Sequence, residues 1–223
     1  VNGVDSPRLW DNATWTTITG ASTPAITGVT TTLLAHVTLF KNRLFFVEST
    51  SMRLWYLPVN SVGGAAAQMD MGSIFRLGGY VMAAYTWTLD AGSGSDDHLV
   101  IISSNGEIAV YRGSDPSSST DWSVIGVFTM GRPLGRRCAV KFGGDLAVNT
   151  YEGVYPLGKG LLSSSVDRRV ALTDKIQNSV SQAASTLGAN FGWQVCLNAD
   201  DNMLILNVPY GGGANYQYAQ NTI

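Results

Sequence analysis

Arginine occurs in adjacent pairs at two places in the sequence, Arg136-Arg137 and Arg168-Arg169. Paired guanidinium groups can clamp a phosphate or a carboxylate, because each presents a planar fork of N–H donors. The same pairs could instead form rim salt bridges, contact passing DNA or lie between subunits. The first pair follows a Gly-Arg-Pro-Leu-Gly turn at residues 131–135, which exposes it. We therefore predict that Arg136, Arg137, Arg168 and Arg169 lie at a subunit contact.

Carboxylates that work as an acid–base pair must share one pocket and differ in their environments. Glu48, Glu107 and Glu152 lie beside apparent strands and could face a central channel. Nothing in the sequence brings two of them together. Asp200 and Asp201 fall in a predicted turn, where Asp hydrogen-bonds its own backbone. We therefore predict no catalytic residues and no enzymatic activity.

Metal ligands and catalytic nucleophiles are also sparse. The chain has two histidines and two cysteines: His36, His98, Cys138 and Cys196. Their spacing lacks the close pairing of a zinc site. The sequence has no Gly-x-Ser-x-Gly nucleophile turn and no phosphate-binding Gly-x-x-x-x-Gly-Lys-Ser/Thr loop. We expect packed or rim histidines, two small buried thiols rather than a disulfide, and neither a cofactor nor a metal.

The composition bounds the class of protein. The 223 residues are 45% hydrophobic and 13% charged, whereas a typical soluble domain carries about 25% charged residues. This balance excludes a disordered chain and a coiled coil. The formal net charge of −2 argues against a strongly basic nucleic-acid binder. No apolar run approaches the roughly 18 residues of a membrane-spanning helix, so we expect no membrane span.

Short apolar strands separated by tight polar turns recur along the chain. Four hairpins are predicted, at residues 39–48, 98–112, 139–149 and 194–208, with turns at Lys41-Asn42, Asn105-Gly106, Gly143-Gly144 and residues 200–202. Asn and Gly suit such turns because they accept positive φ. A third strand is expected after three of the hairpins, at residues 53–59, 153–157 and 215–219. Residues 8–18 resemble a closing strand of this kind with no hairpin before it.

The hairpin units repeat at intervals of roughly 40 to 50 residues, which is the spacing of four-stranded propeller blades. The sequence therefore predicts an all-β fold, a β-propeller-like array of short antiparallel strands; a sandwich or barrel is the alternative. The predicted repeats of this single domain are residues 1–30, 31–79, 80–133, 134–190 and 191–223. Residues 92–97 and 113–120 are polar loops inserted between strands. We expect the chain to be a fragment of a longer protein.

One segment departs from the β pattern, residues 173–186 (TDKIQNSVSQAAST). Thr173 can serve as an N-cap, and Val180 and Ala184 recur at helical spacing. Gly188 would then end the helix. We predict one short surface helix packed on the side of the β array, and a helix that docks a neighbouring subunit is the alternative.

Several stretches of strand and turn sequence have a familiar pattern. They are residues 39–62 (LFKNRLFFVESTSMRLWYLPVNSV), 72–80 (GSIFRLGGY), 86–115 and 131–157 (GRPLGRRCAVKFGGDLAVNTYEGVYPL). Together they resemble the nozzle (tail tubular B-type) structural proteins of short-tailed bacteriophages and prophages. The resemblance covers residues 39 to about 178, and its motifs describe strands and turns, not a catalytic site.

This resemblance implies a propeller-bearing subunit in a homo-oligomeric ring, a hexamer, below the portal and its adaptor. The lumen of such a ring conducts DNA during ejection without reading its sequence, and the outside holds tail fibres. The expected location is the virion tail, after assembly in the host cytoplasm. Family members are several times longer than this chain, and they have no catalytic residues to carry over. A mildly acidic chain with polar loops suits a conduit, because a basic surface would hold DNA back.

Two other functions fit the sequence. A carbohydrate-binding or glycoside-cleaving propeller module would need carboxylates that face a cleft lined by some of the six Trp and nine Tyr residues. We expect most of these aromatic residues in the core or at an interface instead. A cellular scaffold would be a monomer with one polar binding face.

Overall fold

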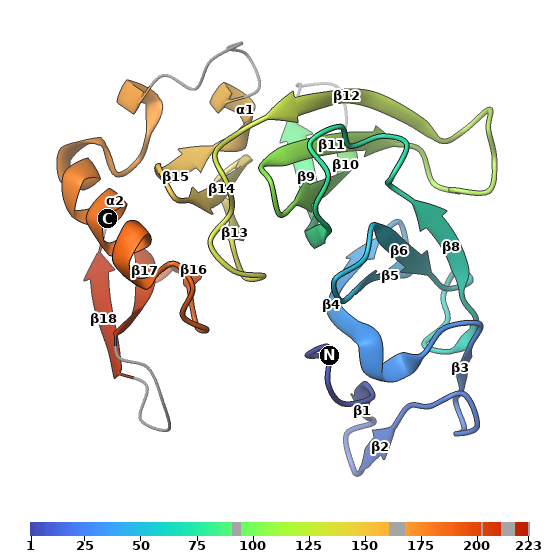
Figure 1. Cartoon of the computed structure of the whole chain (residues 1–223). Helices are drawn as coiled ribbons and strands as arrows, with labels where there is room; N and C mark the ends of the chain where they lie inside the picture. The colour runs from blue at the N-terminus through green and yellow to red at the C-terminus, as the bar shows by residue number, and fades with distance from the viewer. Residues whose placement is uncertain (91–94, 161–167, 202, 211–216, 223) are drawn as a thin grey trace. The chain divides into compact units, whose positions relative to one another are not determined.

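The computed structural model describes residues 1–90, 95–160, 168–201, 203–210 and 217–222. Most of the regular structure in these residues is β-strand, arranged in several small, mainly antiparallel sheets (Figure 1). The prediction of an all-β fold is therefore confirmed. The chain divides into two compact units. The first unit comprises residues 1–86, 97–104 and 109–127, and the second comprises residues 87–96, 105–108 and 128–223.

The first unit contains a four-stranded sheet in the order β4-β5-β6-β8. Its strands are β4 (Leu34–Phe40), β5 (Arg43–Glu48), β6 (Arg53–Tyr56) and β8 (Ala67–Asp70). The predicted hairpin at residues 39–48 is confirmed, with φ of 45° at Lys41 and 58° at Asn42. Two consecutive left-handed residues match the twist of the flanking strands, so they favour a two-residue hairpin turn.

Both faces of this sheet are buried at its central strands, β5 and β6. Side chains alternate along a strand, so the adjacent residues Phe45 and Phe46 of β5 point to opposite faces. One cluster of buried side chains gathers around the first of them: Phe40, Phe45, Val47, Leu54, Tyr56, Met71, Phe75, Val81, Ala84, Leu99, Ile101, Ala109 and Tyr111. A separate cluster covers the other face: Ile18, Ile26, Leu34, Phe46, Trp55 and Leu57.

A second four-stranded sheet has the order β12-β11-β10-β9. Its strands are β9 (Val81–Asp90), β10 (Ser95–Ser103), β11 (Glu107–Arg112) and β12 (Ser123–Thr129). The predicted hairpin at residues 98–112 is confirmed, and Gly106 in its turn has φ of 87°. Strand β10 begins at Ser95, inside the polar loop predicted at residues 92–97, so residues 95–97 are strand; residues 92–94 lie outside the described residues.

The second unit contains two three-stranded sheets. One consists of β13 (Ala139–Phe142), β14 (Asp145–Thr150) and β15 (Gly153–Pro156), and the other of β16 (Gln194–Asn198), β17 (Met203–Tyr210) and β18 (Gln217–Thr222). The hairpins predicted at residues 139–149 and 194–208 are confirmed, and a third strand follows each. One cluster of buried side chains, which includes Ala147, Val154 and Leu206, joins residues of both sheets.

Helix α2 (Gln177–Leu187) contributes Val180 and Ala184 to this cluster, which confirms the predicted helix and its packing on β-structure. The helix starts later than predicted, because a 3₁₀ turn (Asp174–Ile176) precedes it. Thr173 makes no side-chain cap. Its Oγ1 instead accepts a hydrogen bond from the backbone N–H of Val154 at 3.1 Å, which ties the helical segment to β15.

Three short elements differ from the sequence interpretation. Residues 8–18 form a hairpin of β1 (Arg8–Trp10) and β2 (Trp15–Thr17), so the prediction of a single closing strand was wrong. Strands β3 (Ile26–Thr27) and β7 (Gly64–Ala65) form a parallel pair that was not predicted. A four-residue helix, α1 (Leu157–Gly160), follows β15 and is too short to have a helical period in its sequence.

The sheets follow the predicted repeats. Each of the ranges 31–79, 80–133, 134–190 and 191–223 holds one sheet of three or four strands. The agreement concerns these local units, and their closure into a single propeller-like domain stays a prediction. None of the described helices is both long enough and apolar enough to cross a membrane.

Candidate interaction surfaces

The first arginine pair lies just before β13 in the second unit. Arg137 is exposed, and its Nη1 donates a hydrogen bond to Oε1 of Gln194 at 3.2 Å. Its carbonyl oxygen accepts a hydrogen bond from the backbone N–H of Val195 at 3.3 Å. These bonds join the segment before β13 to β16, so Arg137 already has a partner inside the unit. Arg136 is half-buried.

The second arginine pair lies in a 3₁₀ turn, Arg168–Val170. The side chain of Arg169 is exposed, whereas that of Arg168 lies outside the described side chains. The subunit contact of Arg136, Arg137, Arg168 and Arg169 therefore stays a prediction.

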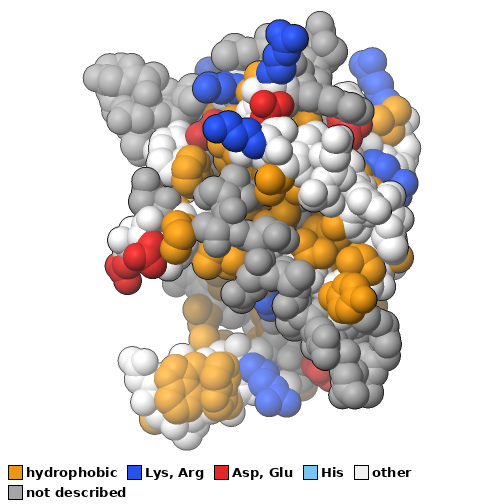
Figure 2. All heavy atoms as spheres, turned by 90° about the vertical axis from the view of Figure 1, so that its left-hand side faces the viewer, with side chains coloured by type: hydrophobic (Ala, Val, Ile, Leu, Met, Phe, Trp, Pro, Cys, Tyr) orange, Lys and Arg blue, Asp and Glu red, His pale blue; other side chains and the backbone are white. Residues whose placement is uncertain are grey.

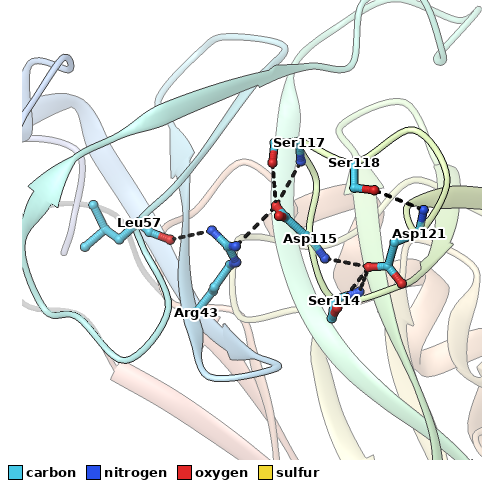
Figure 3. Close-up of polar contacts among 7 residues, drawn as sticks. All are labelled: Arg43, Leu57, Ser114, Asp115, Ser117, Ser118 and Asp121. Atoms are coloured by element: carbon cyan, nitrogen blue, oxygen red, sulfur yellow. Dashed lines mark hydrogen bonds and ion pairs between the residues drawn. The ribbon is translucent and has the colours of Figure 1, made fainter.

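Arg43 of β5, which the sequence did not single out, holds an inserted loop in the first unit (Figure 3). Its Nη2 lies 3.1 Å from Oδ1 of Asp115, and its Nη1 donates to the carbonyl oxygen of Leu57 at 3.3 Å. The guanidinium carbon also lies 5.6 Å from the ring centroid of Tyr56. Arg43 thus contacts both β6, the strand next to β5, and the loop that follows β11.

The loop at residues 113–120 has an ordered hydrogen-bond network around two carboxylates (Figure 3). Oδ1 of Asp115 accepts hydrogen bonds from the backbone N–H and the hydroxyl of Ser117 at 3.1 and 2.8 Å. Oδ2 of Asp121 accepts from the backbone N–H and hydroxyl of Ser114, at 2.6 and 2.9 Å, and from the N–H of Asp115 at 2.9 Å. The Asp and Ser residues of this loop therefore order it, because their side chains hydrogen-bond backbone groups a few residues away.

The two carboxylates titrate below the ordinary range for aspartate. Hydrogen bonds from Ser117, supported by the charge of Arg43, lower the pKa of Asp115. Backbone hydrogen bonds from Ser114 and Asp115 lower the pKa of Asp121. A carboxyl whose pKa is lower in the folded state stabilises that state above its unfolded pKa, and the contribution is lost as the pH falls through the folded pKa.

We expect acid to open the loop at residues 113–121 as the pH falls below the ordinary aspartate pKa of 3.8. Protonation removes the acceptors that hold the N–H groups of Ser114 and Ser117, so the amide signals of these residues should titrate together in NMR spectra. Asp121→Ala should shift the same signals at neutral pH, while Asp200→Ala, in a different exposed turn, should leave them in place. Unchanged Ser114 and Ser117 signals in Asp121→Ala would contradict this account of the loop.

The three glutamates considered for catalysis lie in different elements of the structure. Glu48 is buried; its Oε2 accepts a hydrogen bond from Nε1 of Trp55 at 2.7 Å, and its Oε1 lies 3.0 Å from Nη2 of Arg53. Glu107 is buried in β11, and Glu152 is exposed at the turn between β14 and β15. These two belong to different sheets. Among the described residues there is no group of three or more His, Cys, Asp or Glu side chains that could hold a metal.

The prediction of two buried thiols is confirmed for Cys138 and wrong for Cys196. Both cysteines are free thiols, with Cys138 buried and Cys196 half-buried. Nδ1 of His36 lies 3.5 Å from the backbone nitrogen of Ala84, and its ring meets Tyr85 edge-on with centroids 5.0 Å apart. His98 is buried in β10.

Strand β12 lies at the edge of its sheet (Figure 1). It exposes several apolar side chains. Val124, Ile125 and Val127 are 43%, 49% and 41% exposed. Because side chains alternate along a strand, Val124 projects to one face, whereas the other two project to the opposite face. The strand (SVIGVFT) contains no charged residue and no proline, the features with which exposed strand edges are usually protected from pairing with another chain.

The β1–β2 hairpin exposes two tryptophans directly opposite each other. Trp10 and Trp15 are paired across the hairpin, their ring centroids lie 5.4 Å apart, and the rings are tilted by 42°. They are 47% and 66% exposed, and Figure 2 shows the hydrophobic side chains over this hairpin at the bottom of the view. Trp55, Trp87 and Trp193 are buried, in line with the expectation that most aromatic residues lie in the core or at an interface, whereas Trp10 and Trp15 are exposed.

Comparison with known proteins adds no assignment to these surfaces, because no family model and no curated protein matches the chain.

Proposed function

We propose that this chain is part of a structural protein of a bacteriophage tail, a nozzle subunit that assembles with copies of itself into a ring. The observation that carries the proposal is the apolar edge strand β12, with its three exposed side chains. An unprotected strand edge presents unpaired N–H and C=O groups to any neighbouring chain. A subunit whose edge is covered in an assembly has no need of protective charges there.

The resemblance of residues 39–62 and 131–157 to nozzle proteins is the reason that we propose a tail nozzle as the assembly. In it the ring lies below the portal and its adaptor, fibres attach outside, and DNA passes through the lumen during ejection. The formal net charge of −2 suits such a lumen, because nonspecific affinity for DNA comes mainly from basic side chains on phosphate. The protein then acts in the virion tail as a conduit and has no reaction to catalyse.

Negative-stain imaging of the full-length parent protein, alone and with portal and adaptor proteins, tests this function. Rings with a central lumen are the expected result. Compact single particles under every condition, including with both partners present, would refute the nozzle assignment.

Charge placed on β12 should prevent assembly without unfolding the subunit. We expect the double variant Ile125→Lys, Val127→Lys to give single subunits, because lysines on an edge strand oppose pairing with another chain. Val62→Lys is the matched control: Val62 is similarly exposed but lies in a loop, so this variant should form rings. Mass photometry measures the subunit number, and circular dichroism checks the fold. Normal rings from the double variant would exclude β12 from the contact.

A further inference from the structure

One face of the β1–β2 hairpin carries four exposed side chains that the nozzle proposal does not use. Strand alternation puts Arg8 and Trp10 of β1 on the same face as Trp15 and Thr17 of β2, because Trp10 pairs with Trp15 and Arg8 with Thr17. Leu9 points the other way and packs against the cluster that contains Trp55. The hairpin is therefore anchored by one face, and the two indoles are held on the other.

The indole pair offers flat apolar surface in a polar surrounding. With an interplanar angle of 42°, the rings are not stacked on each other, so the outer face of each is open to a ligand. A Trp side chain can bury roughly 150–250 Å², so the two exposed parts together offer on the order of 250 Å². A stable protein dimer needs about 800 Å² from each partner. The face is too small for a second copy of the chain and matches one or two rings of a small ligand.

The one charged side chain among the four on this face is Arg8, a cation. The carboxylate of Asp11 in the adjacent turn is occupied, because it accepts hydrogen bonds from the N–H groups of Ala13 and Thr14 at 2.9 and 2.7 Å. Arg8 is exposed and forms no ion pair with any residue in the described part of the chain. Arg8 and Trp10 are two residues apart on β1, so their Cα atoms lie about 7 Å apart, and the Arg8 guanidinium has five N–H donors available for a carboxylate.

We infer that this hairpin face binds an acidic saccharide. Pyranose rings have an apolar C–H face that suits an indole and polar edges that suit Thr17, and a uronate carboxylate would bind Arg8 in the bidentate manner that guanidinium groups favour. Single-stranded nucleic acid also stacks on aromatic rings, but it is bound by a positively charged groove that follows the backbone. This face has one cation on a chain of net charge −2, so the saccharide is the better match. The inference stands apart from the nozzle proposal, since binding at the hairpin does not require a ring.

Titrating the 223-residue chain with three probes, followed by tryptophan fluorescence and calorimetry, tests the inference. The probes are hyaluronan tetrasaccharide, which carries uronate, neutral chitotetraose, and a thymidine octanucleotide. We expect saturable binding of the hyaluronan tetrasaccharide and weaker binding of chitotetraose. Trp10→Ala and Trp15→Ala should each weaken hyaluronan binding by about tenfold or more, the size of effect that loss of one stacking ring has elsewhere.

Two further variants make the result decisive. Arg8→Gln leaves both indoles in place and should lower the affinity for hyaluronan to that for chitotetraose. Phe191→Ala removes another highly exposed aromatic ring, which belongs to the second unit, and should bind as the unaltered chain does. The inference is overturned if hyaluronan does not bind at millimolar concentration, or if the tryptophan and arginine variants bind it unchanged. Tighter binding of the octanucleotide would assign the face to nucleic acid instead, and equal binding of both saccharides would remove the role of charge.

Discussion

Replacing Phe45 with Ala is expected to lower the free energy of unfolding of the first unit by about 4 kcal/mol. Phe45 is one of the largest side chains that are almost fully buried. Its ring lies 6.1 Å from Phe40, 5.8 Å from Tyr56 and 6.2 Å from Trp122, measured between centroids. Its removal loses both the transfer free energy of the phenyl group and these aromatic contacts, because a β-sheet cannot close the resulting cavity by moving one side chain.

Urea denaturation followed by near-ultraviolet circular dichroism measures the effect of Phe45→Ala. Leu39→Ala is the matched control, because Leu39 lies in the same hairpin and is largely exposed. It should change the free energy of unfolding by no more than about 0.5 kcal/mol. Equal effects of the two substitutions would mean that the cluster around Phe45 does not form the core of this unit.

Gly106→Ala is expected to destabilise the second unit by about 3 kcal/mol, a large effect for one methyl group. Gly106 has φ of 87°, which disfavours any side chain. A Cβ at this position would overlap the carbonyl oxygen of Met130 and lie 3.1 Å from the carbonyl carbon of Gly131, and both are backbone atoms. The turn also accepts a hydrogen bond from the N–H of Met130 at 2.7 Å, so relief of the overlap breaks that bond.

Gly143→Ala separates the two causes of this effect. Gly143 also has positive φ, at 60°, but a Cβ there would meet nothing within 4 Å. It should therefore cost only the backbone term, about 1–2 kcal/mol. Thermal denaturation of the two variants gives the comparison. Similar losses in both would show that the turn at Gly106 does not pack against residues 130–132.

The turns were the best predicted part of the fold because their signal is local. Lys41, Asn42 and Gly143 have positive φ, and Asn and Gly are residue types that favour this conformation. The hairpin at residues 8–18 was missed although a signal existed. Asp11 and Asn12 are turn formers, and their interruption of an alternating apolar pattern marked the reversal that the structure shows. The β3–β7 pair had no such signal, since two residues per strand leave no pattern.

The functional surfaces were harder to predict because they depend on contacts between distant residues. Adjacent arginines are conspicuous in a sequence, whereas the single Arg43 is not, and its partner Asp115 lies on a loop far along the chain. Whether Trp10 is buried depends on what packs against β1, not on the alternation of its neighbours. The exposure of β12 depends likewise on its place at the edge of a sheet, and strand order is a tertiary property.

The two buried faces of the β4-β5-β6-β8 sheet have a consequence for how its strands align. Residues 45–47 of β5 are apolar toward both clusters, so sliding the strand by one position would still bury hydrophobic side chains. The hydrophobic pattern therefore does not select the register of β5. In a sheet with one solvent-exposed face, by contrast, the pattern does select the register. Glu48 selects the register, because its carboxylate contacts Nε1 of Trp55 and the guanidinium of Arg53 in the observed alignment. A displaced strand would bury the Glu48 carboxylate without hydrogen-bond donors, at a cost of several kcal/mol. This one polar residue therefore selects the register of a strand whose apolar residues would allow more than one.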